Sequence, residues 1–461
     1  MLQRRDFLKL AGLSALSASL PANEPARAAD YTLQIAPVTL ELSSRHRIRT
    51  VAYNGQAPGP LLRLREGRPV TIEVTNRTAR REIVHWHGLF LPPAIDGAVE
   101  EGTPLIEPGA SARYTLVPRP SGLRWYHTHT TAMNDLSLGQ YTGQHGLLMI
   151  ESRDDPGGFD REFFLVLHDW DGHLSAGDDG SMMPSYNVST INGKVLGAGE
   201  PLRVRAGDRV LVHVLNSSPT ETHWLALSGH EMRIVALDGN AVARSDAVPM
   251  LRLAPGERVS ALIDMTSPGV WVFGEPRKHV RAAGMGIVLE YADHAGEAAW
   301  QQPTELIWDY RKFALEAPPN ARRSAPASEP RTIALVFESR FRGHGAMEAW
   351  TINGESYPDA SVEPLVRGQR YRLAFINKSA DDHPLHLHRH TFELRRLNRP
   401  VGAADDTSAR EISGVFKDVV LVNANSRTDV ELVADNPGLS LFHCHQQDHM
   451  DNGFMMLFRY A

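Results

Sequence analysis

The sequence predicts an all-β protein built from three successive Greek-key β-sandwich domains. One strand–turn–strand pattern occurs three times, helical periodicity is scarce, and 30 prolines and 37 glycines are dispersed along the chain. Residues of these two types suit many short strands and turns better than long helices. A chain of 461 residues also exceeds what one hydrophobic core usually supports.

Each copy of the pattern starts at an Asn-Gly pair and ends its second strand at another asparagine. The copies span residues 54–76, 192–216 and 353–377. Each contains an alternating strand, a glycine-containing turn and a second strand rich in β-branched or aromatic residues. The closing asparagines are 140 and 161 residues apart, which is about one small β-domain each.

Every copy also closes with a later strand pair, introduced by Gly122, Gly269 or Gly438. Domain boundaries near residues 155 and 300 follow, giving predicted domains over residues 29–155, 156–300 and 301–461. The stretch Glu316–Glu329 is rich in Ala, Pro and Ser, so we interpret it as a surface connection near the start of the third domain.

The amino-terminal segment is interpreted as a targeting signal. Arg4-Arg5 precedes Phe-Leu-Lys, a short apolar stretch follows over residues 10–20, and Ala26-Arg27-Ala28 offers small residues for cleavage. This order predicts a twin-arginine-type signal peptide over residues 1–28, with the twin-arginine export machinery as a partner and a periplasmic or otherwise exported location. A membrane anchor is the weaker alternative, because the apolar stretch is too short to span a bilayer.

The net charge and the cysteine content limit the possible partners of the chain and the possible roles of its cysteine. A net charge of −6 argues against nucleic acid as a partner. Export usually favours disulfides, but the single cysteine, Cys444, cannot form one within the chain. It is therefore either a buried bystander or a residue with chemistry of its own.

Histidine pairs distinguish the first and third copies from the second. Four His-x-His pairs stand at matching offsets in those two copies: His85 and His87, His127 and His129, His386 and His388, His443 and His445. The second copy has Leu225, Leu227, Gly274 and Pro276 there. Residues i and i+2 of a strand face the same side, so each pair presents two imidazoles to one point. Two domains could thus enclose a cluster of copper, zinc, iron or nickel at their interface.

We interpret seven other histidines as ordinary core or surface residues: His145, His168, His173, His213, His230, His344 and His390.

Cys444 selects among these metals. It lies between His443 and His445, so its side chain points to the opposite face of the strand. With His383 and His449 it offers one thiolate and two imidazoles, the ligand set of a blue copper site. The corresponding positions of the other copies hold Thr128 and Glu275, so only the third domain could form such a site.

These motifs resemble a known family. HWHG at 85–88, HTH at 127–129, HPLHLH at 383–388 and HCHQQDH at 443–449 together are similar to the four copper motifs of multicopper oxidases, most of all three-domain bacterial laccases and metallo-oxidases. The resemblance implies cupredoxin-like domains and four copper ions. It places type 1 copper on His383, Cys444 and His449, and type 2 copper on His85 and His386. It places the type 3 pair on His87, His127, His129, His388, His443 and His445.

The resemblance also implies an activity. A small reducing substrate would give single electrons to the type 1 copper, and Cys444 would pass them to the cluster that reduces O2 to water. We expect a monomer with no stable membrane anchor.

Two further positions matter in such an enzyme. Phe454 stands where the family places the axial type 1 residue and cannot coordinate; the alternative is that Met455 or Met450 supplies a weak sulfur. Asp96 resembles the acid that relays protons to the cluster; the alternative is a turn aspartate. Met450 stands where some bacterial relatives carry a second acid.

The substrate is the least determined feature. Asp381, Asp382, Asp448 and Asp451 flank type 1 ligands and could guide metal ions or bind an aromatic amine, or simply form a solvated rim. A methionine-rich insert is missing, and Met182-Met183 is only a pair. We therefore favour a laccase-type oxidase of phenols and aromatic amines. The alternatives are a periplasmic oxidase of Cu⁺, Fe²⁺ or Mn²⁺, a copper-free periplasmic scaffold, which the complete ligand set disfavours, and a two-domain copper nitrite reductase, which the third repeat disfavours.

Overall fold

The computed structural model describes residues 28–460 except 153–156, 178–179, 317–329 and 403–410. The signal peptide predicted over residues 1–28 and the connection predicted over Glu316–Glu329 therefore lie almost entirely outside the described residues. The described part is dominated by strands, and the all-β prediction is confirmed. No helix in this part is long and apolar enough to cross a membrane.

The first sandwich pairs two four-stranded sheets, with strand orders β2-β1-β4-β6 and β3-β8-β7-β5. Its strands are β1 (Tyr31–Glu41), β2 (Arg47–Tyr53), β3 (Gly59–Arg65), β4 (Val70–Asn76), β5 (Val84–His87), β6 (Ser111–Leu116), β7 (Gly122–Thr128) and β8 (His145–Glu151). Three short helical segments belong to the same part: α1 (Pro93–Asp96), η1 (Val99–Glu101) and η2 (Gly139–Tyr141).

The second sandwich has sheets in the orders β10-β9-β12-β18-β14-β15, with β16 beside β14, and β11-β20-β19-β13-β17. Its elements are β9 (Arg161–Ala176), β10 (Met182–Ile191), β11 (Leu202–Val204), β12 (Arg209–Asn216), β13 (His223–Leu227), β14 (Met232–Leu237), β15 (Asn240–Ala241), β16 (Ala247–Val248), β17 (Leu251–Leu253), β18 (Arg258–Asp264), β19 (Val270–Gly274), α2 (Lys278–Ala282) and β20 (Gly286–Tyr291).

The third sandwich has sheets in the orders β23-β22-β25-β31-β27-β29 and β24-β33-β32-β26-β30, with a small β21-β28 pair. Its elements are η3 (Tyr310–Phe313), β21 (Leu315–Glu316), β22 (Arg331–Arg340), β23 (Ala349–Ile352), β24 (Glu363–Leu365), β25 (Arg370–Asn377), β26 (His383–Leu387), β27 (Phe392–Pro400), β28 (Ile412–Ser413), β29 (Phe416–Lys417), β30 (Val419–Val422), β31 (Ser426–Val433), β32 (Leu439–Cys444), α3 (Gln447–Asp451) and β33 (Met455–Tyr460).

The asparagines that end each repeat have the same structural role in all three sandwiches. Asn76, Asn216 and Asn377 are fully buried. Each side-chain oxygen accepts a hydrogen bond from the backbone N–H two residues later, at 2.8–2.9 Å. Each side-chain nitrogen donates to a carbonyl group of the following loop and to a second carbonyl farther along the chain, that of Ile106, Leu253 or Asn423. The asparagine therefore fixes the loop that leads into the strand where the sequence places a His-x-His pair or its leucine counterpart.

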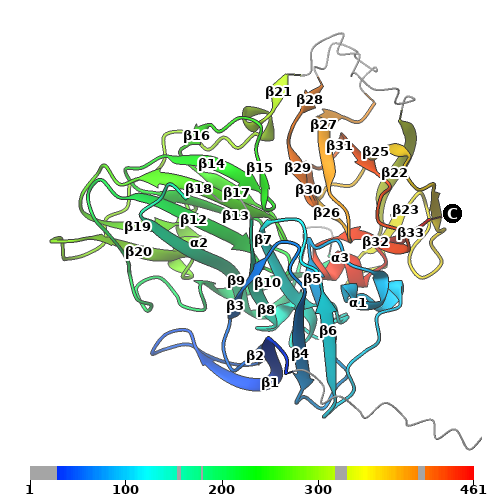
Figure 1. The fold of residues 1–461 in the computed structure, drawn as a ribbon, viewed down its shortest axis with the longest axis horizontal. Helices are drawn as coiled ribbons and strands as arrows, with labels where there is room; N and C mark the ends of the chain where they lie inside the picture. Colours follow the sequence, from blue (N-terminus) through cyan, green and yellow to red (C-terminus); the bar gives the residue numbers. More distant parts are fainter. Residues whose placement is uncertain (1–27, 153–156, 178–179, 317–329, 403–410, 461) are drawn as a thin grey trace, which may run out of the picture.

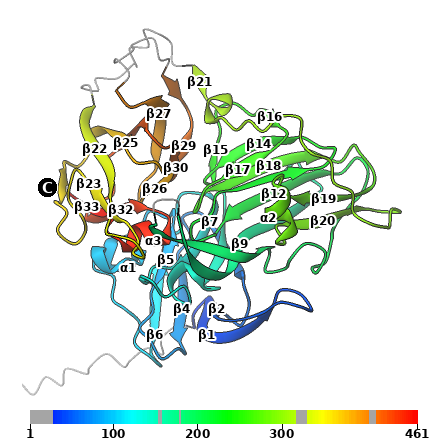
Figure 2. The same cartoon turned by 180° about the vertical axis from the view of Figure 1, so that it is seen from behind.

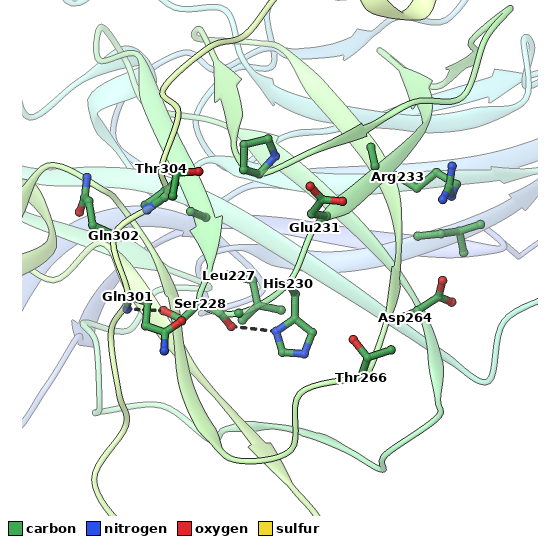
Figure 3. Close-up of a pocket in the computed structure, with 16 residues that line it drawn as sticks. Leu227, Ser228, His230, Glu231, Arg233, Asp264, Thr266, Gln301, Gln302 and Thr304 are labelled. Carbon is green, nitrogen blue, oxygen red and sulfur yellow. Dashed lines mark hydrogen bonds between the residues drawn. The ribbon is translucent and has the colours of Figure 1, made fainter.

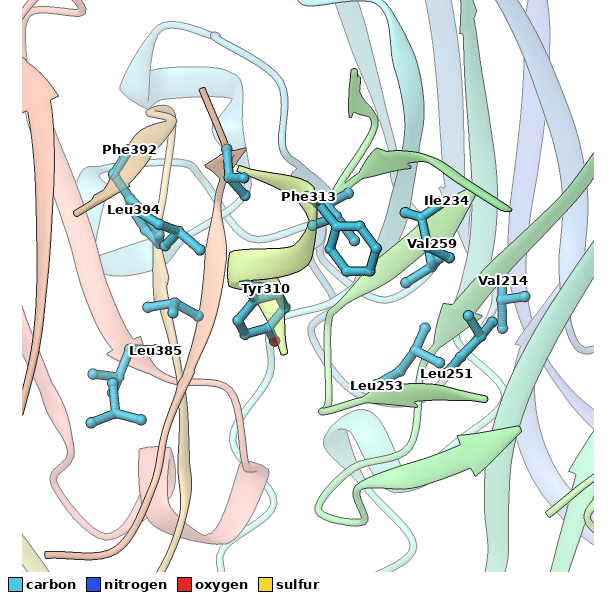
Figure 4. Close-up of a cluster of buried hydrophobic side chains, with 14 of the residues drawn as sticks. Val214, Ile234, Leu251, Leu253, Val259, Tyr310, Phe313, Leu385, Phe392 and Leu394 are labelled. Atoms are coloured by element: carbon cyan, nitrogen blue, oxygen red, sulfur yellow. The ribbon is translucent and has the colours of Figure 1, made fainter. Parts of the chain in front are cut away.

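The three sandwiches pack against one another (Figures 1 and 2). One continuous hydrophobic core joins the second to the third, and the segment between them supplies Tyr310 and Phe313 to it. Figure 4 shows these two rings between Leu251 and Leu253 on one side and Leu385 and Phe392 on the other. The first sandwich has its own core and meets the third where η1 contacts β32. The histidine-bearing strands of the first and third sandwiches thereby come together.

Candidate metal centres

The four His-x-His pairs converge between the first and third sandwiches. His85 lies opposite His127 in the pairing of β5 with β7, and His386 lies opposite His443 in the pairing of β26 with β32. Across the interface, the rings of His85 and His388 stack with centroids 3.9 Å apart, and those of His87 and His386 with centroids 3.8 Å apart. All eight side chains are buried. The structure thus brings together every residue that the His-x-His spacing singled out.

The two ring nitrogens of these histidines have different surroundings, as they do in histidines that bind a metal. Nδ1 of His85, His127, His386 and His443 each lies 2.7–2.9 Å from a backbone carbonyl oxygen. Nε2 of His85, His127, His129 and His386 has no hydrogen-bond partner among the described residues, and neither has Nδ1 of His87. Nε2 of His388 lies 3.1 Å from Nε2 of His443. One nitrogen anchored to a carbonyl and the other left free is the pattern of imidazoles that ligate a metal.

The charge state of the cluster suits the same role. Burial, together with the neighbouring imidazoles, lowers the pKa of seven of these histidines well below the usual value, so their rings are neutral: His87, His127, His129, His386, His388, His443 and His445. Neutral imidazole is the form that coordinates a metal ion. Eight buried imidazoles therefore fit a cluster of copper ions.

Asp96 joins the two halves of the cluster. Its side chain is buried, and Oδ2 lies 3.0 Å from Nδ1 of His388 and 3.2 Å from Nδ1 of His85. The backbone carbonyl of Asp96 also accepts from Nδ1 of His85, at 2.9 Å. The carboxylate therefore contacts one histidine from each sandwich.

Glu101 is a buried acid at the cluster that our sequence analysis missed. Its Oε1 accepts a hydrogen bond of 2.6 Å from the backbone N–H of Leu441 and lies 3.5 Å from Nδ1 of His388. Burial, reinforced by Asp96, raises its pKa well above the usual value. No repeat or motif that we recognised in the sequence marks it. Met450, where a second acid was sought, packs instead in a hydrophobic cluster with Ala98 and Leu441.

Asp418 is the second residue that the sequence analysis missed. Its carbonyl accepts from Nδ1 of His386 at 2.7 Å, and its Oδ1 lies 3.1 Å from Nε2 of His87. Arg258 of the second sandwich donates to both carboxylate oxygens, at 2.5 and 2.6 Å, and holds the pKa of Asp418 below its usual value despite burial. Asp418 therefore ties two cluster histidines to the second sandwich.

Cys444 and two histidines form a separate site on the other face of β32. Cys444 Sγ lies 3.7 Å from Nδ1 of His383 and 3.6 Å from Nδ1 of His449, and the two nitrogens are 3.2 Å apart. Burial lowers the pKa of His383 well below its usual value and that of His449 to about 4. One sulfur and two neutral imidazoles within this distance fit a single copper ion.

Aromatic side chains enclose this site. The fully buried Phe454 ring lies 4.8 Å from the ring of His383, between centroids, and stacks against Trp350. Trp350 in turn contacts His449 at 4.2 Å. Met450 and Met455 belong to the hydrophobic cluster around Ala98 and Leu441. These contacts favour Phe454 over either methionine as the neighbour of the site.

A cavity of about 360 Å³ opens beside His449. Three thioethers lie along it, from Met182, Met183 and Met347, and two of its carboxylates come from Asp381 and Asp448. Burial raises the pKa of Asp448 to about 6. The other two acids of the predicted rim have structural partners: Asp382 pairs with Arg252 at 2.7 Å, and Asp451 accepts the N–H groups of Ala132 and Met133.

A larger cavity, of about 500 Å³, lies in the second sandwich and includes no residue of the four histidine motifs (Figure 3). His230 in its wall contacts the Ser228 carbonyl through Nδ1, at 2.8 Å, and lies 2.6 Å from the Tyr291 hydroxyl. His390 of the third sandwich has the same two kinds of partner, the His388 carbonyl and Tyr460. Both histidines are thus structural elements of the repeat.

Comparisons with known proteins identify the family. Sequence models of multicopper oxidases match residues 34–155, 161–283 and 336–461. The chain is 28% identical to multicopper oxidase MmcO of Mycobacterium tuberculosis, covering 96% of this chain and 90% of that protein, and 21% identical to copper resistance protein A of Escherichia coli, covering 98% of each. The crystal structure of a multi-copper oxidase from Pseudomonas thermotolerans superposes with a TM-score of 0.70 at 26% identity, covering 94% of this chain and 100% of the other. The chain therefore belongs to the multicopper oxidase family and is a copper-dependent oxidoreductase that uses O2 as its electron acceptor.

Proposed function

We propose that this protein is an exported oxidase that takes single electrons from a small reducing substrate at one copper and uses four of them to reduce O2 to water. The observation that carries the proposal is Cys444. Its side chain faces His383 and His449, while its chain neighbours His443 and His445 face the histidine cluster. Two sites that share one strand in this way suit electron entry at the first and oxygen reduction at the second.

Within this proposal the first site holds type 1 copper on His383, Cys444 and His449. Type 2 copper binds His85 and His386, and the remaining six cluster histidines bind the type 3 pair. Bound copper supplies the one-electron chemistry at both sites. The chain holds the imidazoles neutral, orients them through backbone carbonyls and Asp418, and encloses both sites in buried side chains. Asp96, which contacts His85 and His388, is the acid that would relay protons to the cluster. Glu101, whose pKa burial raises, holds a proton beside His388.

The reducing substrate binds in the cavity beside His449. This histidine is the proposed type 1 copper ligand that lines the cavity. We propose phenols and aromatic amines as the main substrates. The Trp350 ring and the thioethers offer apolar contact for an aromatic ring, and Asp448 offers a carboxyl group that accepts the proton a phenol loses on oxidation. With a pKa of about 6, Asp448 is close to the range in which such a transfer is efficient.

Cuprous ion is the second candidate substrate, and the three thioethers favour it. Met182 and Met183 come from β10 and Met347 from the loop before β23, so the structure joins a pair that looked isolated in the sequence to a third methionine. Thioethers are soft ligands that select Cu⁺, and carboxylates stabilise its charge. Two relatives are named for copper resistance.

Oxygen uptake by copper-loaded protein distinguishes the two substrates. Replacing Met182, Met183 and Met347 together by leucine preserves apolar contact but removes the sulfurs, whereas Asp448→Asn preserves size but removes the proton acceptor. Loss of Cu⁺ oxidation alone in the leucine variant supports the cuprous role, and loss of phenol oxidation alone in Asp448→Asn supports the laccase role. A fully loaded wild type that consumes O2 with neither phenols, aromatic amines, Cu⁺, Fe²⁺ nor Mn²⁺ would refute the proposal.

A further inference from the structure

The second sandwich holds a buried ionic cluster at the position where the third has its cysteine site. Glu275 and Cys444 each lie six residues after the glycine that introduces their strand, Gly269 or Gly438. The backbone N–H of Glu275 donates to the Met285 carbonyl at 3.1 Å, and that of Cys444 donates to the Phe454 carbonyl at 3.2 Å. The two side chains therefore occupy equivalent places in equivalent sheets.

A histidine occupies the centre of this ionic cluster. His223 Nε2 lies 2.7 Å from Oδ2 of Asp169, and Nδ1 lies 3.5 Å from Oε2 of Glu275. The exposed fractions of the three residues are 1%, 2% and 0%. Burial alone would lower the pKa of His223, but the two carboxylates raise it to about 10, so the ring is an imidazolium. We call these three residues the His223 cluster.

The His223 cluster fixes both ends of the loop over residues 217–222. At the start of the loop, Asp169 accepts the Ser218 hydroxyl, and Asn216 accepts the Ser218 N–H at 2.9 Å. At its end, Glu275 Oε2 accepts the backbone N–H of Trp224 at 2.9 Å. Glu275 also holds Arg277, which donates to the Thr222 carbonyl at 2.9 Å.

The same loop contacts the segment between Cys444 and His449. The Pro219 carbonyl accepts the backbone N–H of Gln447 at 3.0 Å, and the Thr220 carbonyl accepts the Gln446 side chain at 3.2 Å. Gln446 Oε1 in turn lies 4.0 Å from Cys444 Sγ. The 217–222 loop therefore connects the His223 cluster to the segment that carries Cys444 and His449.

We propose that His223 is a positioning residue for the type 1 copper. Held between Asp169 and Glu275, it keeps the 217–222 loop against Gln446 and Gln447 and so sets the spacing of Cys444 and His449. This inference rests on the proposed type 1 assignment. The second sandwich would then carry, at the position of the cysteine site, a charged histidine that supports the neighbouring copper.

The test compares copper-loaded His223→Gln with wild type and with His230→Gln. His230 is a matched control, because it is also a buried histidine of the second sandwich but bonds to Ser228 and Tyr291, outside the 217–222 loop. We expect His223→Gln to lose type 1 copper roughly tenfold more readily, the lower end of the range for residues that orient metal ligands. Its type 1 electron paramagnetic resonance signal should change, while copper at the histidine cluster stays unchanged. His230→Gln should keep the wild-type signal.

A second variant protects the test against misfolding of His223→Gln. Arg277→Met removes the bond to the Thr222 carbonyl from a partly exposed residue, and we expect a smaller change of the type 1 signal in the same direction. An unchanged type 1 signal and unchanged copper retention in both variants would overturn the positioning role. A fully loaded wild type without any type 1 signal would instead overturn the type 1 assignment itself.

Discussion

The second and third sandwiches use one position in opposite ways. In the third, Cys444 lies beside two neutral histidines, and these three residues form the ligand set that we propose for type 1 copper. In the second, Glu275 lies beside a charged histidine and a second carboxylate, so opposite charges satisfy one another without a metal. A repeat can thus keep its backbone hydrogen bonds while exchanging a metal for an ion pair, and its chemistry depends on a few side chains.

Replacing Cys444 by serine should have the largest effect, because it removes the residue that distinguishes the third sandwich. We expect complete loss of the intense visible absorption of the thiolate–copper bond, one fewer copper per chain and no substrate oxidation. Absorption spectra, copper analysis and oxygen uptake measure these losses. Copper at the eight histidines should remain, and its loss as well would show that the two sites do not form independently.

Glu101→Gln should rank second. Glu101 belongs to the first sandwich but contacts Leu441 and His388 of the third. The His223 cluster, in contrast, lies within one sandwich. We expect oxygen uptake at saturating substrate to fall about 10- to 100-fold, the range for residues that orient metal ligands. Type 1 absorption should stay unchanged because Glu101 acts on the Leu441 N–H and on His388, not on the residues of the cysteine site. Glu100→Gln, one residue earlier, is the control and should retain most activity.

Glu275→Gln tests the second sandwich. Glu275 pairs with His223 and with Arg277, so removing its charge leaves Arg277 without its carboxylate partner. Breaking a buried pair in this way typically costs about 3 kcal/mol of unfolding free energy. Thermal unfolding of the metal-free protein, compared with Asp264→Asn on the exposed end of β18, measures this cost. Equal stability of the two variants would contradict the ionic account of the cluster.

The charged groups of the His223 cluster should make the stability of the second sandwich depend on pH. The folded pKa of His223, about 10, lies above its ordinary value of about 6.5, so its stabilisation is complete below pH 6.5 and is lost as the pH rises through 10. Glu275 has a folded pKa of about 2, so its contribution is lost as the pH falls from its ordinary value toward 2. Asp169, Glu221 and His168 also interact electrostatically with His223.

The measurable quantity is the difference in unfolding free energy between wild type and His223→Gln. It should stay constant between about pH 5 and 6.5 and shrink toward pH 10. A difference that grows with rising pH would show that His223 is neutral in the folded protein.

Phe454→Met should have the smallest effect. Met285 already occupies the equivalent position in the second sandwich, where its carbonyl accepts the Glu275 N–H. A thioether beside His383 would offer the copper a weak fourth ligand, so we expect a lower type 1 reduction potential. Redox titration of the visible absorption measures it. Phe454→Leu, which adds no ligand, should stay near wild type, and an equal shift in both variants would indicate packing as the cause.

The sequence predicted those site residues that belong to a repeated motif or that alternate between the two faces of a strand. The His-x-His pairs were found because residues i and i+2 of a strand share a face, and Cys444 because it points the other way. Comparing the copies at equal offsets also placed Glu275. These signals are local, so the strand geometry carries them without knowledge of the fold.

Contacts between distant segments were not predictable in the same way. Asp418 reaches His87 across 331 residues, and no period or motif marks it. Met347 joins Met182 and Met183 only because the loop before β23 folds over β10. Glu101 was not predictable either, because its burial and its contact with Leu441 depend on β32 of another sandwich.

The histidine cluster is shared between two sandwiches. Retention of its metal therefore indicates whether the first and third sandwiches are still packed together. Four of its imidazoles come from residues 85–129 and four from residues 386–445, so neither sandwich holds the whole set. Separation of the first sandwich from the third would release the shared ions before either core unfolds. Metal release during gentle denaturation should therefore precede the loss of β-structure, and the interval between the two events would measure how firmly the sandwiches are joined.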